Sequence, residues 1–481
     1  MSDSLRIAVV GGGITGLAAA HRVYEIAPMA SVRLFEATGR IGGVLRTVRQ
    51  DGLLIEQSAD NFITNVPWGI DLCRRLGMES ELLTTDETRR QAFVIHRGNL
   101  VKVPQGFLLM TPSQLLPVLT TPLLSPLGKL RLLAEWFVPP RRSRDDESLG
   151  SFVRRRFGRQ VFERLVQPLV GGIYTADPER LSVAATMPRF VKMEQDFGSL
   201  IRATLKTKKN RENSAEADAS GARYGMFVAP RDGMASIADR LGEKLPAETI
   251  QLNAVVDRIE RVAAGSWQLT IAQAARGEPL PPERAEFDAV IVAVPAFRAA
   301  RLLEGVNAEL AGLLDQIPYA STAVVTLAYR RADVAHPLDG FGFVVPAIEK
   351  RQILAASFAS NKFTGRAPED QVLIRVFIGG ASQPELAELS DERLRAIAVT
   401  ELSELLGISG EPLSVGIVRW PRSMPQYHVG HKVLVERIEA LAAQAPGLAL
   451  AGNAYHGVGV PNCIHSGEQA AEAVGRIFNP S

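Results

Sequence analysis

The stretch Gly11-Gly12-Gly13-Ile14-Thr15-Gly16 carries three glycines at the spacing G-x-G-x-x-G. The apolar run Arg6–Val10 stands directly before it and predicts a buried parallel strand. The alanine-rich segment Leu17–Ala27 follows and predicts a helix, which Pro28 ends. In such a turn the first glycine allows a tight bend, the second lets a pyrophosphate approach the backbone, and the third lets the helix pack closely on the strand. Amides at the helix start and the helix dipole would hold the phosphate charge.

A second strand-like run, Ser31–Phe35, leads into Glu36, which follows Gly16 by 20 residues. A carboxylate at that place can accept hydrogen bonds from the hydroxyls of an adenosine ribose. A glycine-rich turn without any ligand is the plain alternative. Strand, turn, helix, second strand and acid all stand in the order that nucleotide binding requires, so we predict a Rossmann-type unit at the start of the chain.

The next segment separates FAD from NAD as the cofactor. Arg40-Ile41-Gly42-Gly43 places a cation and two small residues beside the expected diphosphate. The pattern is similar to that of flavin oxidoreductases of the amine-oxidase type, and the similarity implies FAD. The cysteine that amine oxidases use for covalent attachment is replaced around Ala454-Tyr455, so we expect non-covalent binding. The cofactor-binding residues implied in this region are Gly11, Gly12, Gly13, Ile14, Thr15, Gly16, Glu36, Ala37, Arg40, Gly42, Gly43 and Val44.

Composition limits the class of protein. A chain of 481 residues predicts two or three domains, and 46% hydrophobic with 22% charged residues fits globular domains. The net charge of +2 gives no support to nucleic-acid binding. Cys73 and Cys463 are too few for a disulfide framework and indicate a reducing compartment. We expect no signal peptide before the first strand and no apolar stretch long enough to span a membrane, which favours a cytoplasmic protein.

Further pieces of the nucleotide-binding domain are expected far along the chain. Phe287–Pro295 and Leu448–Gly452 predict buried strands, and Cys463–Phe478 predicts a closing helix. Between the two strands, Thr322–Leu327 and Val372–Phe377 predict a sheet that would receive a substrate. The expected fold class is α/β, and α+β overall. It combines a discontinuous Rossmann-type FAD-binding domain, a mixed-sheet substrate domain and a small helical domain.

The helical domain is expected in the first insertion. Phe107–Pro140 is rich in leucine, and its prolines predict several short helices, while Ser148–Gly158 predicts a further helix. The charge run from Lys206 to Asp218 predicts a solvated linker. The expected domain limits are 1–60, 225–297 and 432–481 for the FAD-binding domain, 61–104 and 298–431 for the substrate-binding domain, 105–205 for the helical domain, and 206–224 for the polar linker.

Four more segments, taken with the glycine motif, resemble one family. They are Gln167–Ser182, Gly365–Glu369 with Ile378-Gly379-Gly380, Trp420–Tyr427 with Gly430-His431, and Leu450–Cys463. Their patterns and their order are similar to those of the protoporphyrinogen oxidase and coproporphyrinogen III oxidase family, a branch of the flavin amine oxidase superfamily. Together the matches span essentially the whole chain.

The resemblance implies an FAD-dependent oxidase of haem biosynthesis. Such enzymes remove six electrons from a porphyrinogen in three cycles of flavin reduction, with O2 forming H2O2. A meso hydrogen would leave as hydride to flavin N5, and a pyrrole N–H would lose a proton. No acid–base pair stands out, so no catalytic side chain is assigned. The helix beginning near Cys463 would stabilise the reduced flavin with its N-terminus, unless it is a packing helix alone.

The resemblance also implies cofactor contacts farther along the chain. Val256 matches a position whose backbone approaches the adenine, with Val255 as a close rival. The residues that would lie along the flavin ring are Asn453, Val458, Gly459 and Val460.

Three positions resemble substrate contacts of the family. Gly172 matches a glycine whose backbone lies near the porphyrin, and Val344 and Phe363 match apolar residues that sandwich the macrocycle. Plain core packing is the alternative for Val344 and Phe363.

One departure from the family bears on the substrate. Mitochondrial-type relatives carry an arginine for a propionate where this chain has Gln91-Ala92-Phe93. Its absence favours coproporphyrinogen III over protoporphyrinogen IX. Cations that would substitute for it are Arg89, Arg90, Arg97 and Lys102.

Other classes of protein stay open. An amine oxidase or a carotenoid desaturase is the first, and Asp177-Pro178 and Pro425-Gln426-Tyr427 stand against it. A non-catalytic nucleotide-fold protein that binds a partner is the second, and the flavin segment near the C-terminus argues against it. No metal is expected, because paired Cys/His spacing is missing around His428, His431, His456, Cys463 and His465.

The expected partners are a porphyrinogen and O2. Because relatives dock on bilayers to exchange substrate, the leucines of Phe107–Pro140 also suggest transient contact with a membrane surface or with the next haem-pathway enzyme. We favour the interpretation that these leucines line the substrate channel or form the core of their own domain, because no basic stripe stands beside them.

Overall fold

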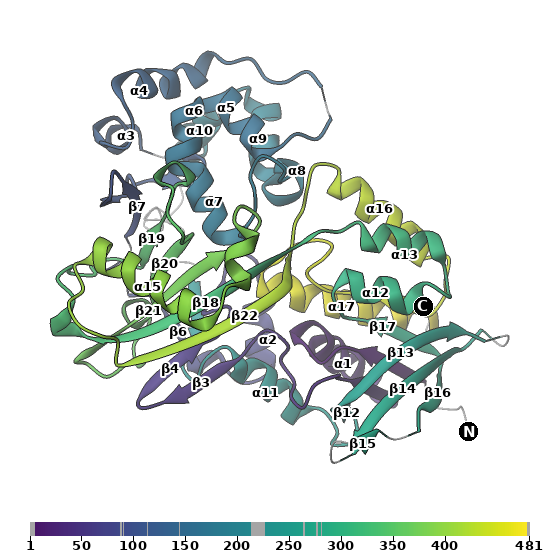
Figure 1. Ribbon diagram of the computed structural model, residues 1–481. Coiled ribbons are helices and arrows are strands. Elements are labelled where there is room, and N and C mark those ends of the chain that lie inside the picture. The colour runs from purple at the N-terminus through teal and green to yellow at the C-terminus, as the bar shows by residue number, and fades with distance from the viewer. Residues whose placement is uncertain are drawn as a thin grey trace.

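The computed structural model in Figure 1 describes residues 5–86, 89, 91–112, 114–143, 145–212, 227–262, 265–275, 278–279 and 281–478. A parallel sheet with its helices lies at the lower right of the view, a larger mixed sheet at the lower left, and a helical domain at the top. The predicted fold class, an α/β nucleotide-binding domain with a mixed sheet and a helical domain, is confirmed.

The parallel sheet is assembled from distant segments of the chain. Its strand order is β12 (Ile250–Gln251), β2 (Ser31–Phe35), β1 (Arg6–Val10), β17 (Ala289–Val292) and β23 (Leu448–Leu450). Every pair in it is parallel. By order of appearance this is 3-2-1-4-5, the arrangement of a Rossmann sheet. The strands predicted at the start, middle and end of the chain therefore do form one sheet.

One face of this sheet is covered by three helices, α1 (Ile14–Ile26), α11 (Ala235–Lys244) and α17 (Val460–Phe478). In Figure 1 the yellow helix α17 lies along the purple helix α1. A Cβ added to Gly467 would lie 2.2 Å from the Thr15 carbonyl oxygen, so only glycine permits this approach. Helix α17 begins three residues before the predicted start at Cys463, with Pro461 in its first turn, where its missing N–H costs nothing.

The other face packs on an antiparallel sheet and three more helices. Trp267 is fully buried at the centre of this second core. The elements are β13 (Ala254–Arg261), β14 (Trp267–Ala275), β15 (Glu278–Pro279), β16 (Glu283–Phe287), α12 (Ala296–Leu303), α13 (Ala308–Asp315) and α16 (His431–Ala442).

The mixed sheet has seven strands. Their order is β22 (Ser414–Pro425), β18 (Tyr319–Arg330), β21 (Gln371–Gly379), β20 (Ala355–Phe358), β19 (Gly342–Val344), β7 (Ala92–His96) and β8 (Asn99–Lys102). The two predicted runs fall within β18 and β21, which pair antiparallel. Helix α15 (Asp391–Leu406) packs on one face over Phe343 and Phe358. The opposite face carries Val344 and Arg375 and turns towards the nucleotide-binding domain and α7.

Smaller elements lie between the parallel sheet and the mixed sheet or beside them. Near the mixed sheet lie the hairpin of β3 (Thr47–Gln50) and β4 (Leu53–Glu56) and the short helix α14 (Ala359–Lys362). A three-stranded sheet, next to helix α2 (Trp68–Arg75), consists of β5 (Phe62–Ile63), β11 (Phe227–Pro230) and β6 (Leu82–Thr84).

The helical domain contains short helices, as its prolines predict. They include α3 (Leu115–Thr120), α4 (Pro126–Leu133), α5 (Leu149–Phe157), α7 (Gln167–Tyr174), α8 (Val183–Thr186), α9 (Pro188–Phe197) and α10 (Leu200–Glu212). The prediction for Ser148–Gly158 is confirmed: the Ser148 hydroxyl caps α5, and Gly158, at a φ of 91°, ends it. The linker prediction is wrong for residues 206–212, because α10 continues through them. Residues 213–224 lie outside the described part of the chain, and the domain limits stay predictions.

Candidate cofactor and substrate site

The glycine turn forms a cradle that excludes side chains. It leaves β1 at its carboxyl end, between β2 and β17, where the strand order of the sheet reverses. Gly11 has a φ of 108°, and a Cβ there would lie 2.6 Å from the Ala293 carbonyl oxygen. A Cβ on Gly16 would lie 1.9 Å from the Gly11 carbonyl oxygen. The turn and the first residues of α1 therefore offer bare backbone to a ligand.

Glu36 lies beside this turn. Its carboxylate accepts hydrogen bonds from the Gly12 N–H (2.8 Å) and from the N–H and hydroxyl of Thr38 (2.8 and 2.7 Å). A carboxylate offers about four lone-pair positions, so one remains for a ribose hydroxyl. Strand β13 adjoins this corner, since the Ala254 N–H donates to the Glu36 carbonyl at 2.9 Å.

Val255 and Val256 differ in their surroundings on β13. Val256 is buried in the core, whereas Val255 is 40% exposed. Which of the two backbones approaches an adenine stays a prediction.

The segment 40–44 packs against the glycine turn. The Gly42 N–H donates to the Gly12 carbonyl at 2.8 Å, and a Cβ on Gly43 would lie 3.1 Å from the Cα of Gly13. The Arg40 guanidinium donates to the carbonyls of Ile41 and Leu45 at 3.1 and 3.3 Å, and burial lowers its pKa. Arg40 thus holds the loop itself, and its contact with a diphosphate stays a prediction.

The predicted flavin segment connects β23 to α17, at the same end of the sheet. Tyr427 fixes its shape: the hydroxyl donates to the Asn453 carbonyl at 2.5 Å and accepts from the Gly457 N–H at 2.8 Å. The His431 ring stacks on Tyr427 with 3.9 Å between centroids. Burial lowers the pKa of His431 to about 4 and raises that of Tyr427, so both rings are neutral at pH 7. The sequence motif contained Tyr427, but nothing in it indicated these bonds.

Two of the three predicted substrate residues, Gly172 and Val344, lie next to each other. A Cβ on Gly172 in α7 would lie 3.1 Å from Cγ1 of Val344 and 3.8 Å from Cβ of Ala355. Phe363 follows α14 and is buried, with the Arg366 guanidinium 5.6 Å from its ring centroid. Contact of these residues with a porphyrinogen stays a prediction.

Three of the four cations considered for a propionate, Arg89, Arg97 and Lys102, lie on the surface. Arg89 is next to Asp86 at 3.5 Å, and Lys102 forms an ion pair with Asp339 at 2.9 Å. Arg97 is exposed at a turn, and Arg90 lies outside the described residues. In the part of the chain that the structure describes, no three His, Cys, Asp or Glu side chains are grouped as a metal site requires.

Comparisons with known proteins identify the class. The chain belongs to the flavin containing amine oxidoreductases, whose profile matches residues 14–475. It is 32% identical to the coproporphyrinogen III oxidase of Bacillus subtilis, with 100% of both chains covered. It is 30% identical to protoporphyrinogen oxidase 2 of Arabidopsis thaliana, with 98% of this chain and 93% of the relative covered.

Solved structures agree on the fold. A crystal structure from Exiguobacterium, assigned provisionally to the protoporphyrinogen oxidases, has a TM-score of 0.85 and 31% identity, with 99% of both chains covered. Cyclohexylamine oxidase from Brevibacterium oxydans shares the fold alone, with a TM-score of 0.69, 16% identity, and 99% and 100% coverage.

The cofactor is therefore FAD, and the residues present fit it. The glycine turn admits no side chains at Gly11 and Gly16, Glu36 keeps an acceptor position, and the loop that Tyr427 holds lies at the same end of the sheet. Bound FAD supplies the acceptor for a pair of electrons from the substrate.

Proposed function

We propose that this protein is an FAD-dependent oxidase of haem biosynthesis that converts a porphyrinogen into the porphyrin. The similarity to coproporphyrinogen III oxidases over the whole chain is the observation that carries the proposal. The substrate would be coproporphyrinogen III, with protoporphyrinogen IX as the alternative. The product carries six hydrogens fewer than the substrate, so three molecules of O2 would take up six electrons and six protons and leave as three of H2O2.

The residues of this protein would act by positioning the cofactor and the substrate. The glycine cradle would hold the cofactor, and Tyr427 would fix the segment that we expect to lie along the flavin ring. The apolar contact of Gly172 with Val344 would form one wall for the flat substrate and exclude water from it. The pyrrole N–H proton released with each hydride would be taken up together with it when O2 becomes H2O2, so the proposal assigns no acid–base pair to the protein.

The experiment mixes the purified holoenzyme with coproporphyrinogen III without oxygen. We expect the visible flavin absorption to bleach within the first turnover and to return when air is admitted, with three H2O2 formed for each porphyrin. Initial rates on protoporphyrinogen IX, measured in parallel, rank the two substrates. Flavin that stays oxidised with both porphyrinogens would contradict the proposal, and bleaching by a primary amine instead would favour an amine oxidase.

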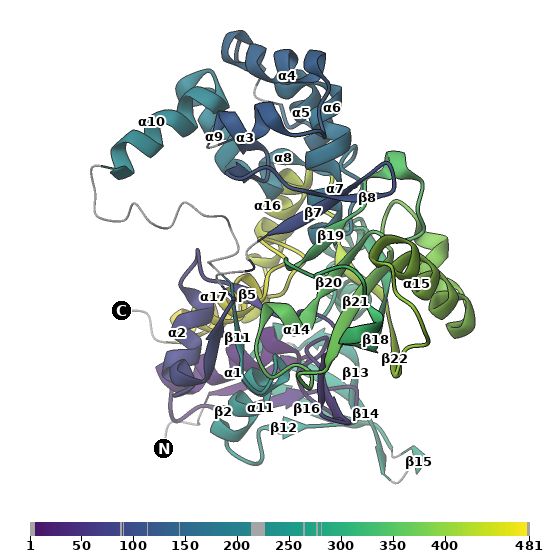
Figure 2. The same ribbon diagram turned by 90° about the vertical axis from the view of Figure 1, so that its left-hand side faces the viewer.

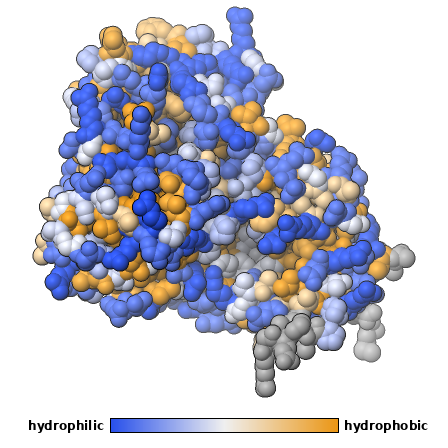
Figure 3. All heavy atoms as spheres, in the orientation of Figure 1, coloured by the Kyte–Doolittle hydropathy of each residue, from blue (hydrophilic) through white to orange (hydrophobic). Residues whose placement is uncertain are grey.

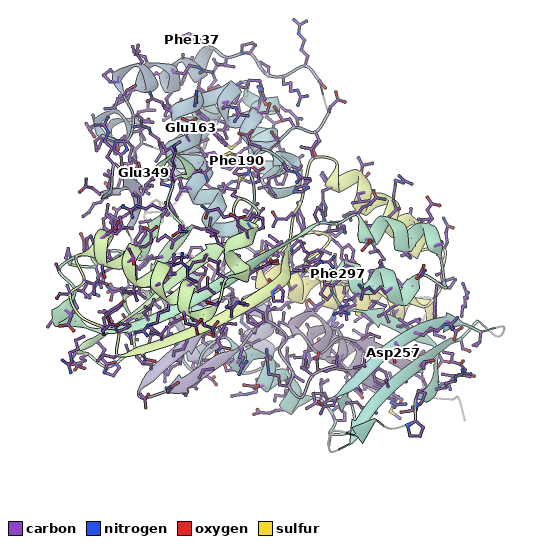
Figure 4. The ribbon with its side chains drawn as sticks, in the orientation of Figure 1. Phe137, Glu163, Phe190, Asp257, Phe297 and Glu349 are labelled. Carbon is purple, nitrogen blue, oxygen red and sulfur yellow. The ribbon has the colours of Figure 1, made fainter. Side chains whose placement is uncertain are left out.

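We further propose that the helical domain touches a membrane surface. Several large apolar side chains stand exposed at its outer end, where Figure 4 shows Phe137 at the edge of the molecule and Figure 3 shows hydrophobic side chains at the top. They are Leu116, Leu127, Leu130 and Phe137, the last of them 84% exposed. Lys129 lies within the same helix as Leu127 and Leu130, and one lysine near an anionic lipid surface contributes about 1 kcal/mol. Other leucines of this segment, such as Leu124 and Leu132, form the core of the domain.

Vesicle flotation tests the membrane contact. We expect the protein to float with vesicles of phosphatidylcholine and phosphatidylserine, and the double variant Leu127→Glu/Leu130→Glu to stay at the bottom of the gradient. If the wild-type protein stays at the bottom of the gradient, the proposed membrane contact is wrong. Among the described residues, no helix is long and apolar enough to cross a bilayer.

A further inference from the structure

Two polar side chains lie on the same face of the mixed sheet as Val344. Val344 pairs with Ala355 of β20, which pairs with Phe377 of β21. Two residues farther along β20, Ser357 pairs with Arg375. Side chains two residues apart on a strand share a face, about 7 Å from each other, so Ser357 and Arg375 continue the wall that Val344 begins. Figure 2 shows β19, β20, β21 and α14 next to one another.

Both side chains keep a polar atom without a partner. Ser357 Oγ and Arg375 Nε are buried and make no hydrogen bond among the described residues. Arg375 is 1% exposed and Ser357 is 7% exposed. A buried donor without an acceptor is costly and rare in folded proteins, so a missing acceptor is indicated at this place.

The charge of the cluster points to an anion. Lys362 Nζ and Arg375 Nη1 lie 3.1 and 3.2 Å from the same oxygen of Asp60. Burial raises the pKa of Asp60, but the two cations hold it at about 2, so one carboxylate serves two cations.

The neighbouring acid Glu56 does not bond to the unpaired donors of Ser357 and Arg375. Burial raises the pKa of Glu56, whose carboxylate accepts from the Met234 N–H and the Thr47 hydroxyl. The Arg366 guanidinium adds a third cation close by, bonded to the carbonyls of Pro230 and Arg231. Three cations, Lys362, Arg375 and Arg366, thus lie near two carboxylates, those of Asp60 and Glu56, which leaves one positive charge in excess.

The cluster adjoins the predicted cofactor loop. The Arg375 guanidinium donates to the Ser58 carbonyl, and the Ser58 hydroxyl donates to the Val44 carbonyl at 2.5 Å. Lys362 is followed directly by Phe363, a predicted substrate residue. The unpaired donors thus lie between the loop expected to hold FAD and the sheet expected to receive the porphyrinogen.

We propose that Lys362, Arg375 and Ser357 form a subsite for one carboxylate of the substrate. This inference rests on the proposed function, and it assigns the residues that determine which porphyrinogen binds. A carboxylate oxygen would accept from Ser357 Oγ and Arg375 Nε, and the other oxygen from Lys362 Nζ. Coproporphyrinogen III carries four propionates and protoporphyrinogen IX carries two, because vinyl groups replace the others. The proposed subsite binds one of the two propionates that protoporphyrinogen IX lacks, and it therefore selects the tetracarboxylate.

Lys362→Met tests the subsite, since it removes the ammonium and keeps the length of the side chain. We expect KM for coproporphyrinogen III to rise about tenfold or more with kcat changed less than twofold, as for the loss of one charge-assisted hydrogen bond. KM for protoporphyrinogen IX should change less than twofold. Equilibrium quenching of porphyrin fluorescence should show the same pattern, with coproporphyrin III bound about tenfold more weakly and protoporphyrin IX unchanged.

Four further variants make the test specific for the subsite. Lys362→Arg should restore most of the binding, and Ser357→Ala, which leaves both ion pairs of Asp60 in place, should weaken coproporphyrin III binding several-fold. Arg437→Met is the control, because it breaks the exposed Arg437–Glu309 pair of similar length, and it should change the binding of neither porphyrin. Lys102 is a rival cation for a propionate, so an effect of Lys102→Met with none of Lys362→Met would overturn the subsite.

Other results would also overturn it. Equal losses on both porphyrins would mean that Lys362 only holds the loop at Asp60. A shift of the flavin reduction potential without a change in porphyrin binding would mean that the cluster faces the cofactor. If the wild-type enzyme oxidises neither porphyrinogen, the proposed function fails, while the porphyrin-binding comparison still tests the subsite.

Discussion

Gly16→Ala is expected to give a protein that has lost its flavin. The added Cβ would lie 1.9 Å from the Gly11 carbonyl oxygen and 3.1 Å from the Gly11 carbonyl carbon. Both are backbone atoms of the turn, so the turn and α1 must move apart. Overpacking of this kind costs about 1–3 kcal/mol, which corresponds to a loss of FAD affinity of about fivefold to 150-fold. The ratio of flavin to protein after purification, and titration of the apoprotein with FAD, measure it.

Two other glycines make the test specific. Gly312→Ala in α13 is the matched control: nothing lies within 4 Å of its added Cβ, so it should bind FAD normally and be slightly more stable. Gly13→Ala meets only the Cα of Gly43, at 3.9 Å, so the fold should tolerate it. If a pyrophosphate approaches Gly13, this variant should fold with wild-type stability and still bind FAD poorly. A Gly16→Ala protein with a full complement of FAD would contradict the assignment of the cradle.

The nucleotide-binding half could be predicted from local sequence. The glycine turn, β1, β2 and the acid at Glu36 are neighbours in the chain, and short-range rules for strands, helices and turns place each of them. Boundaries were less accurate: α17 starts at Val460, where Pro461 fits a first helical turn, and α10 runs through a charged segment that resembles a linker.

The polar contacts of the site could not be predicted in the same way. Tyr427 reaches Asn453 only because β22 ends next to the loop after β23, and Ser357 meets Arg375 only through the register of β20 with β21. Lys362 and Asp60 are 302 residues apart. Register is set by packing of whole strands, so a single sequence without relatives carries no signal for such pairs.

The helical domain gives another pairing of this kind, and its loss should have the largest effect on stability. Arg156 of α5 and Glu135 are both fully buried, with Arg156 Nε 2.8 Å from Glu135 Oε1. Glu135 also accepts from the Leu200 and Ile201 N–H groups at 2.9 and 3.2 Å, so it caps the start of α10. One carboxylate thus joins two helices inside the domain.

Arg156→Ala should lower the free energy of unfolding by about 3–5 kcal/mol, because it leaves the Glu135 carboxylate buried without its cation. Urea unfolding, followed by circular dichroism, measures it. The matched control is Arg154→Ala, two residues earlier in α5. Arg154 is partly exposed and pairs with Glu179 on the surface, so its loss should cost less than about 1 kcal/mol. Equal losses of stability for the two variants would mean that the buried Arg156–Glu135 pair contributes no more to the free energy of unfolding than an exposed pair does. Glu135→Ala should lower the stability at least as much as Arg156→Ala. It leaves the Arg156 guanidinium buried without its carboxylate, and it also removes the cap of α10.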